Sequence, residues 1–558
     1  MTTLSRTRSS CLRAAIVLAT LAPLGPLAAC SSASSGASRG AGGAGGAPGS
    51  GGTGIDLDAG PQDSGKGGHP AADPKTCEEA AETKSYVGCD FWPTVLTNPV
   101  WDVFDFTVVV ANGGDQAGEV TIERAGKLVS GGAVPPKGLT KFHLPWVPEL
   151  KGPEMNQCAD WTAPSASLRV PDGAYHLVSS VPVTVYQFNP LEYASKGGPA
   201  GKDWSSCPGH LTCAANGWSY GCFSYSNDAS LLLPTPALTG NYRVIGQRGW
   251  AKDGVPAYVA VVGTADATKV TVSVSPTGAV AAGNGIAAAG GGQSLNLSLE
   301  RGEVVELVGT PSTDLAGTLI QSSAPVQVIA GMPCVNLPFD AYSCDHIEES
   351  VFPAETLGKR YFVTRPTGPN GVALGHMVRL VGNVDGTALT YFGMTPANAP
   401  ASIDAGQVVD LGLVTQDFEV VGSHELAVAS FQLGSSVVDP GNTQPRGDPS
   451  QSAMIGVEQF RTQYVFLAPH DYDVSYVDVV SPEGATVLLD GSALLAPPAV
   501  LSNGYVVVRQ MLGPGIDGAH LIVSDMPVGI QVIGYGVATS YQYPGGSNLV
   551  RIAPPPIK

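Results

Sequence analysis

One strand-like segment recurs four times along the chain, and this repeat limits the folds that the chain can adopt. We call it the repeat segment: SSVPVTVYQF at 179–188, SSAPVQVIAG at 322–331, SHELAVASF at 423–431 and SDMPVGIQV at 524–532. From Pro182 to Pro325 the period is 143 residues, and the two later periods are 100 and 102 residues. Propeller blades repeat every ~40–50 residues. The longer period therefore indicates four domain-sized units rather than blades.

Each copy of the repeat segment closes a set of strands that come in the same order. Each set begins with two strands in which apolar and polar residues alternate, joined by a hairpin turn such as Asn112-Gly113 or Asp385-Gly386. A third strand, which begins after a glycine, comes next, and the repeat segment follows it. Gly (71) and Pro (45) are abundant, which favours turns and strands over helices. We therefore expect an all-β fold of four tandem, related β-sandwich-like units at 75–227, 228–346, 347–453 and 454–558.

The repeat makes two structural predictions. No helical domain longer than about 40 residues should follow Pro74. Equivalent positions of the four segments should be buried, namely Val183, Val326, Leu426 and Val528. A further recurring piece at 228–246, 347–365 and 454–468 combines a short apolar stretch with a strand that carries a tyrosine, at Tyr242, Tyr361 and Tyr464.

The N-terminus has the pattern of an export signal. A basic start and an apolar run over 1–29 end in LAAC at 27–30, which resembles the lipobox of bacterial lipoprotein precursors. In that class the cysteine, here Cys30, is lipidated and begins the mature chain. Residues 30–74 are rich in Gly and Ser and should form a disordered tether. We expect an exported bacterial lipoprotein, held at the outer membrane or cell surface through Cys30.

The charge and the cysteines agree with an exported protein. The formal net charge of −18 argues against a nucleic-acid partner. Eight cysteines follow Cys30, and an even number in an exported chain predicts four disulfides. Cys77 and Cys89, and Cys334 and Cys344, are near neighbours in sequence and form the expected local pairs. The remaining four allow three pairings: Cys158, Cys207, Cys213 and Cys222.

The first unit is longer than the others because of an insertion between Phe188 and Asp228. A stretch this long without a strand pattern is usually functional or disordered, and its cysteines can staple it. It is rich in aromatic residues, and rigid aromatic side chains on stapled loops are typical of recognition surfaces. The predicted binding residues are Trp204, Trp218, Tyr220 and Tyr225. We expect Trp204, Trp218 and Tyr220 to be partly exposed on one face. The alternative is that these rings cover the end of a sandwich.

The stretch from about 228 to 364 resembles the IgGFc-binding protein N-terminal domain family. Its motif S-x-x-P-V-x-V-x-x-G-x-x-C matches 322–334, and Cys344, Asp345 and His346 follow with Glu348 and Glu349. Residues 446–558 follow the pattern more loosely. The resemblance implies an extracellular recognition or matrix module, with an unknown protein or glycan as ligand.

No catalytic, cofactor or metal motif stands out. CDHIEES at 344–350 and HDYDVSYVD at 470–478 contain possible metal ligands, but a disulfide-closed polar turn and a turn-forming loop explain them. The Arg-Gly-Asp tripeptide at 446–448 lies in a turn-rich stretch. We therefore expect a non-catalytic protein for adhesion or ligand recognition, with no cofactor and no metal. The alternatives are a secreted carbohydrate-active hydrolase, which needs two paired carboxylates, and a structural spacer of the envelope or matrix.

Overall fold

The computed structural model describes residues 73–195, 198–341, 344–470 and 472–556. All of them belong to one compact unit of the chain, Gly68–Lys558. The predicted signal peptide, the lipidated Cys30 and all but the last two residues of the predicted tether lie outside the described residues.

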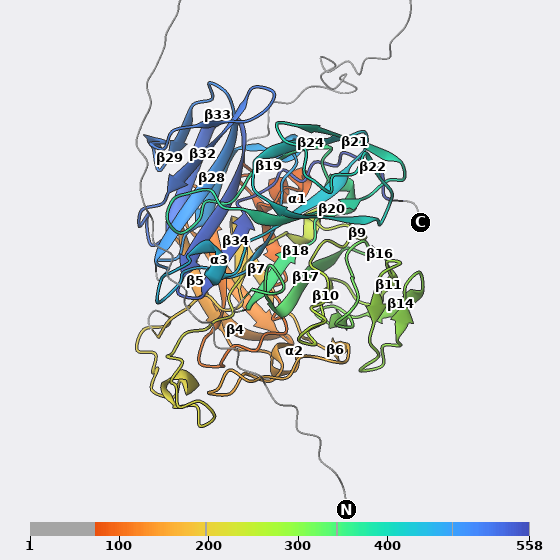
Figure 1. Cartoon of the computed structure of the whole chain (residues 1–558), viewed down its shortest axis with the longest axis vertical. Coiled ribbons are helices and arrows are strands. Elements are labelled where there is room, and N and C mark those ends of the chain that lie inside the picture. The colour runs from red at the N-terminus through yellow and green to blue at the C-terminus, as the bar shows by residue number, and fades with distance from the viewer. Residues whose placement is uncertain (1–72, 196–197, 342–343, 471, 557–558) are drawn as a thin grey trace, which may run out of the picture. The chain divides into compact units, whose positions relative to one another are not determined.

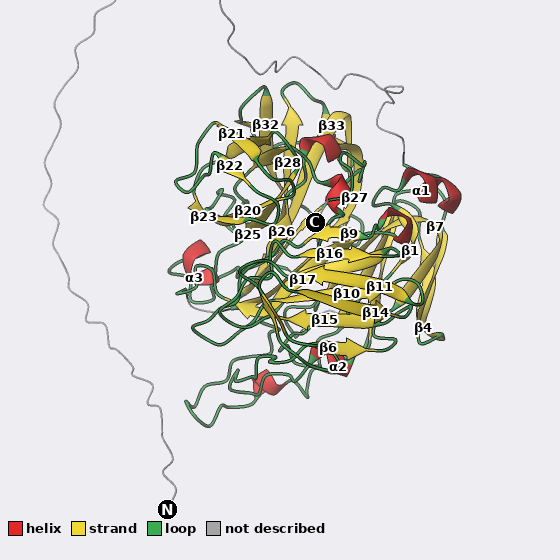
Figure 2. Ribbon diagram, turned by 90° about the vertical axis from the view of Figure 1, so that its right-hand side faces the viewer, coloured by secondary structure: helices red, strands yellow, loops and turns green. Residues whose placement is uncertain are grey.

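The described chain is nearly all β, which confirms the expected fold class. Helices are few and short (Figure 2). The longest described helix has seven residues, so the prediction of no helical domain is confirmed for this part of the chain. The helices are α1 (Cys77–Thr83), α2 (Pro148–Lys151) and α3 (Ser435–Val438), with 3₁₀ turns η1 (Pro208–His210), η2 (Thr235–Ala237), η3 (Ala354–Thr356) and η4 (Val457–Gln459).

The first two units differ in how their sheets are built. The first forms a single curved sheet from β1 (Gly88–Phe91), β2 (Phe106–Asn112), β3 (Gly118–Arg124), β4 (Lys127–Val134), β5 (Gly138–Leu144), β7 (His176–Phe188) and β8 (Ala229–Leu232). The second has β9 (Asn241–Arg243), β10 (Tyr258–Gly263), β11 (Thr268–Ser273), β12 (Ala279–Val280), β13 (Ala289–Gly290), β14 (Ser294–Leu299), β15 (Val304–Val308), β16 (Leu319–Ser322), β17 (Val326–Val335) and β18 (Asp345–Ser350). Its two main sheets have the orders β18-β17-β10-β15-β6 and β14-β11-β16-β9, where β6 (Leu168–Val170) comes from the preceding unit.

The last two units show the same difference in the opposite order: the third has two sheets and the fourth has one. The third contains β19 (Arg360–Val363), β20 (His376–Gly382), β21 (Thr387–Phe392), β22 (Ser402–Ile403), β23 (Val408–Val414), β24 (Phe418–Gly422), β25 (Leu426–Phe431) and β26 (Gln451–Ala453) in two sheets. The fourth forms one sheet from β27 (Arg461–Leu467), β28 (Val474–Pro482), β29 (Val487–Leu489), β30 (Ser492–Ala493), β31 (Ala499–Val500), β32 (Tyr505–Met511), β33 (Ala519–Gly536) and β34 (Thr539–Pro544).

The same pairing pattern underlies all four units. The first strand of each hairpin (β2, β10, β20 or β28) lies between the strand after the glycine and the strand of the repeat segment. In the outer two units the repeat segment and its lead-in form one long strand, β7 or β33, which runs from one half of the sheet into the other. In the middle two units the strand breaks, giving β16 and β17, or β24 and β25, and the sheet separates into a sandwich.

The marked positions of the four repeat segments are buried, as predicted. Val183, Val326, Leu426 and Val528 are all 0% exposed. The four units also share one continuous hydrophobic core, which includes Val109, Val261, Ala429 and Val479. The exact unit boundaries stay a prediction, since β6 pairs outside its own unit.

Four strands, one from each unit, form a closed ring: β8, β18, β26 and β34. Each of these strands pairs with the strand that carries the repeat segment of its unit. Between units, β8 contacts β18 and β34, and β26 contacts the same two strands. Each ring strand contributes one residue at an equivalent place. This residue pairs with the repeat-segment residue that lies five positions after the marked buried one. The four residues are Ala229, Glu348, Gln451 and Gln542. Their backbone N–H groups all donate to the buried Asp228 carboxylate, at 2.9, 3.1, 2.9 and 3.4 Å. One side chain therefore ties the four units together.

Candidate binding loop and the charged cluster at its base

The insertion in the first unit forms a loop held by two disulfides. We call residues 189–227 the stapled loop; it leaves β7, projects beyond the sheets and returns to β8 (yellow in Figure 1). Cys207 bonds to Cys222 within the loop, and Cys213 bonds to Cys158 outside it. This selects one of the three pairings that the sequence left open. The two expected local disulfides, Cys77–Cys89 and Cys334–Cys344, are confirmed.

The predicted aromatic residues divide into an inner and an outer group. Trp204 and Tyr225 pack against a small core around Trp101, and the Trp204 ring lies 5.1 Å from that of Phe104. Trp218 is 70% exposed, while Trp204, Tyr220 and Tyr225 are half-buried. The expected exposure of Trp204, Trp218 and Tyr220 is therefore confirmed. Their common face and their role in binding stay predictions.

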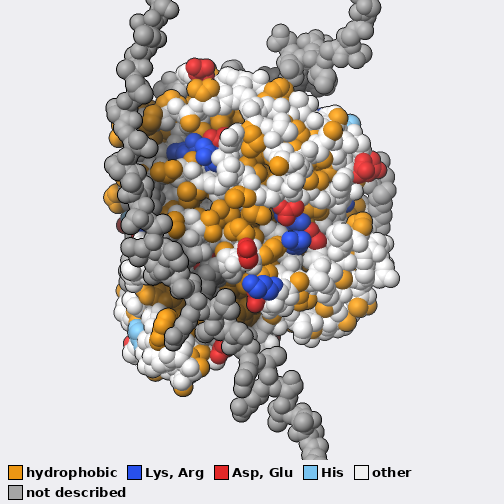
Figure 3. Space-filling view, in the orientation of Figure 1, with side chains coloured by type: hydrophobic (Ala, Val, Ile, Leu, Met, Phe, Trp, Pro, Cys, Tyr) orange, Lys and Arg blue, Asp and Glu red, His pale blue; other side chains and the backbone are white. Residues whose placement is uncertain are grey.

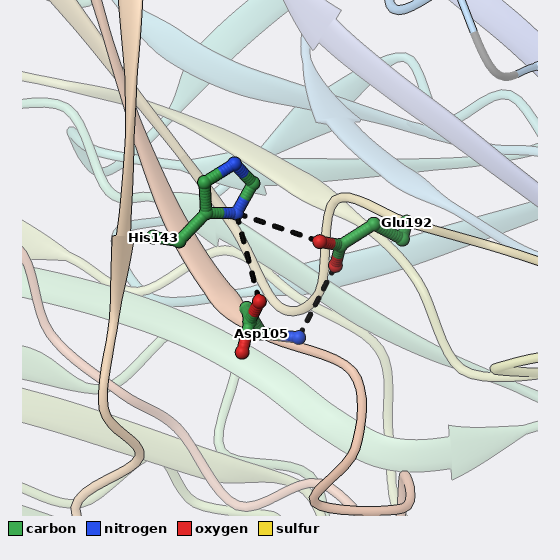
Figure 4. A group of neighbouring side chains, drawn as sticks. All are labelled: Asp105, His143 and Glu192. Atoms are coloured by element: carbon green, nitrogen blue, oxygen red, sulfur yellow. Dashed lines mark hydrogen bonds and ion pairs between the residues drawn. The ribbon is translucent and has the colours of Figure 1, made fainter. Parts of the chain in front are cut away.

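A charged cluster lies where the stapled loop meets the sheet of the first unit. We call Asp105, His143, Glu192 and Lys202 the base cluster (Figure 4 shows the first three). Asp105 directly precedes β2, His143 is in β5, and the other two belong to the loop. His143 Nδ1 lies 3.4 Å from Glu192 Oε1 and 3.8 Å from Asp105 Oδ2. Lys202 Nζ lies 2.7 Å from Asp105 Oδ2 and 3.5 Å from Glu192 Oε1.

Burial controls the electrostatics of this cluster. The Glu192 side chain is 1% exposed, and burial raises the pKa of its carboxyl to about 7 although the Lys202 ammonium opposes the shift. Burial also lowers the pKa of His143, so its imidazole is neutral at physiological pH. The backbone N–H of Asp105 donates to Glu192 Oε2 at 3.1 Å and fixes the orientation of the carboxyl group.

The base cluster has the donor types of a metal site. One ligand atom from each of Asp105, His143 and Glu192 lies within 4.8 Å of the others. The Lys202 ammonium lies between the Asp105 and Glu192 carboxyl groups, where a metal ion would lie. No local sequence pattern indicates this cluster, because its members are separated by 38, 49 and 10 residues and belong to no motif.

The metal ligands considered in the sequence have structural partners instead. Asp345, His346 and Glu348 lie on β18 and are 0% exposed; His346 Nε2 is 3.1 Å from Glu348 Oε2. This stretch is a buried strand rather than the expected polar turn. Asp471 lies outside the described residues, and its neighbour Asp473 accepts a hydrogen bond from Tyr193. Asp448 of the Arg-Gly-Asp tripeptide is 1% exposed, so this motif cannot be presented to a receptor in this fold.

The surface visible in Figure 3 carries charged side chains of both signs. On the described part of the face in Figure 3, basic and acidic side chains lie beside one another in small groups, and no broad basic patch forms. None of the helices in the described part of the chain has the length and hydropathy of a transmembrane segment.

Two comparisons with known proteins identify relatives. The family model described as IgGFc binding protein matches residues 228–534. The human IgGFc-binding protein is 26% identical over 324 residues, which cover 56% of this chain and 6% of the human protein. The chain thus spans a small part of that relative's length. No solved structure gives a significant match. The family match begins at Asp228, directly after the stapled loop.

Proposed function

Because the chain belongs to the IgGFc binding protein family, we propose that it is a non-catalytic ligand-recognition protein of the cell surface. The name of the human relative refers to the Fc part of immunoglobulin G. For this chain we propose an extracellular protein or glycan as ligand. The LAAC sequence at 27–30 supports export as a bacterial lipoprotein with a lipid on Cys30.

The observation that carries the proposal is the exposure of Trp218 on the stapled loop. A tryptophan that is 70% exposed, on a loop closed by two disulfides, offers a large contact area at a low cost in conformational entropy. Leu211, in the same loop, is 59% exposed and adds apolar surface. The family match supports a shared scaffold, and the loop outside it supports a ligand preference of this chain's own.

Substitution of Trp218 by alanine tests this site. Binding of the wild-type chain is first measured on an array of extracellular glycoproteins and glycans that includes immunoglobulin G Fc. Trp218→Ala should weaken binding to the recognised component at least about tenfold, because it removes a central aromatic contact worth more than about 1.4 kcal/mol. Thermal stability should stay nearly unchanged because the ring is largely exposed.

A matched control separates recognition from general stickiness. Leu495, in the fourth unit, is 89% exposed, and Leu495→Ala should leave binding unchanged. Equal binding by Trp218→Ala and the wild type would exclude the stapled loop as the recognition site.

A further inference from the structure

We propose that Asp105, His143 and Glu192 form a binding site for a divalent transition-metal cation such as Zn²⁺, which replaces the Lys202 ammonium in the base cluster. Zinc sites in proteins use imidazole nitrogen and carboxylate oxygen, commonly from three side chains with a further position open to water. The cluster supplies one nitrogen and two carboxylates, each from a different element, within 4.8 Å of one another. This site is separate from the proposed recognition surface at Trp218.

The orientation of the donors supports this assignment. His143 presents Nδ1 to both carboxylates (Figure 4). The hydroxyl of Thr107 lies 3.1 Å from this nitrogen, but it also lies 3.3 Å from the Asp105 carbonyl oxygen and can donate there instead. The ring nitrogen can therefore give its lone pair to a cation without leaving the hydroxyl unpaired.

Glu192 provides the second, independent observation. Its side chain is 99% buried, and Oε2 is held by the backbone N–H of Asp105. The other oxygen, Oε1, faces His143 and Lys202 at 3.4 and 3.5 Å and accepts no hydrogen bond from the described residues. A buried carboxylate oxygen that is oriented by the backbone and lacks a hydrogen bond is suited to a metal ligand.

Two carboxyl groups of the base cluster converge on one position that already holds a cation. The Lys202 ammonium occupies this position, 2.7 Å from Asp105 Oδ2 and 3.5 Å from Glu192 Oε1, and a metal cation that takes its place would keep a positive charge between the two carboxyl groups. Lys202 also has another favourable contact, because its ammonium lies 4.5 Å from the centre of the Trp204 ring. Its displacement therefore costs less than the loss of an isolated buried ion pair.

Such a site would connect the stapled loop to the sheet. Asp105 and His143 flank or belong to strands of the first unit, and Glu192 belongs to the loop. The cation would hold the loop more firmly than Lys202, and it would change the surroundings of Trp204. Tryptophan fluorescence is thus a direct readout of binding.

The test is a titration of the metal-free exported chain with Zn²⁺ at constant pH, followed by calorimetry and tryptophan fluorescence. We expect one ion per chain. His143→Gln should weaken binding by more than the about 10- to 100-fold cost of losing an outer-shell partner. Lys202→Met removes the competing ammonium and should strengthen binding about tenfold, a change of about 1.4 kcal/mol. His210→Ala, which changes an exposed histidine of the same loop, should have no effect.

The proposal is wrong if neither the wild type nor Lys202→Met shows saturable Zn²⁺ binding. It is equally wrong if His143→Gln, folded as judged by its thermal unfolding, binds as tightly as the wild type. Should His143→Gln fail to fold, the gain in affinity on Lys202→Met still decides the question.

Discussion

Three tyrosines fix the same junction in three of the four units. Tyr242, Tyr361 and Tyr464 each follow a 3₁₀ turn and donate a hydrogen bond to the carbonyl of Val326, Leu426 or Val528, the marked buried position of the repeat segment. Each hydroxyl also accepts the backbone N–H three residues earlier. The sequence showed that these tyrosines recur. It could not show their partners, which lie 84, 65 and 64 residues further along the chain.

Removing one of these hydroxyls should be costly. Tyr361→Phe leaves the buried N–H of Gly358 and the carbonyl of Leu426 without this partner, so we expect a loss of about 1–3 kcal/mol in the free energy of unfolding. Urea denaturation measures the loss. Tyr391→Phe is the control, because the Tyr391 hydroxyl makes one half-buried bond to Pro400 and should cost less. Equal losses for the two variants would contradict the proposed role of the junction.

A buried glutamate predicts a pH dependence of stability. Glu306 is 0% exposed, and burial raises the pKa of its carboxyl from 4.5 to about 7, against the opposing hydrogen bonds from Thr97. Between these two pKa values, the Glu306 carboxyl is ionised in the unfolded chain but protonated in the folded chain. The free energy of unfolding therefore decreases as the pH rises through this window. The total over this window is about 3 kcal/mol.

Glu306→Gln removes this dependence. The stability of the variant relative to the wild type should increase between pH 4.5 and about 7 and then level off. Urea denaturation at several pH values measures the difference. A difference that does not vary with pH would show that Glu306 does not titrate in this window.

At the scale of elements, the sequence predicted strands and turns better than it predicted their continuity. Alternation and turn residues located the hairpins, and close spacing identified Cys77–Cys89 and Cys334–Cys344. Whether the repeat segment continues its lead-in strand, as in β7, or breaks from it, as before β17, depends on packing between sheets rather than on local pattern. The base cluster was not predictable either, because its members meet only when the loop docks on the sheet.

The two short-range disulfides of the first unit allow a matched comparison. Cys207–Cys222 and Cys77–Cys89 close loops of similar size, with separations of 15 and 12 residues, so removing either should cost about 3 kcal/mol in the chain-entropy account. Only Cys207→Ser with Cys222→Ser should open the stapled loop to limited proteolysis within 189–227. Cleavage there in Cys77→Ser with Cys89→Ser would show that the loop depends on the stability of the whole unit.

At the scale of the whole molecule, the Asp228 carboxylate joins strands from all four units. Burial raises the pKa of Asp228 well above its ordinary value, and the N–H groups that it accepts oppose this shift. Asp228→Ala would leave four backbone N–H groups near the ring without this acceptor. We expect a loss of several kcal/mol in the free energy of unfolding, larger than for Asp228→Asn, which keeps one carbonyl oxygen.

Urea denaturation of these variants gives the test. Asp266→Ala is the control, because Asp266 accepts the N–H of Arg301 in an exposed turn and should cost little. If Asp228→Ala is no less stable than this control, the carboxylate does not hold the ring together.

The proposed anchor is also a property of the whole chain. Cys30→Ala should move the protein from the membrane fraction to the soluble fraction, because it removes the thiol that the lipid would modify. Fractionation of cells that express each form measures this. Membrane retention of Cys30→Ala would rule out the lipid anchor.

The closed ring has a consequence for how such a chain can evolve. In an open solenoid, a repeat can be gained or lost at either end, because each repeat contacts only its neighbours. Here β8, in the sheet of the first unit, contacts β34, the last strand of the fourth, so the series has no free end. Loss of one unit would open the circle, and a fifth would have no place in it. The copy number is therefore set by geometry, and variation is confined to insertions such as the stapled loop.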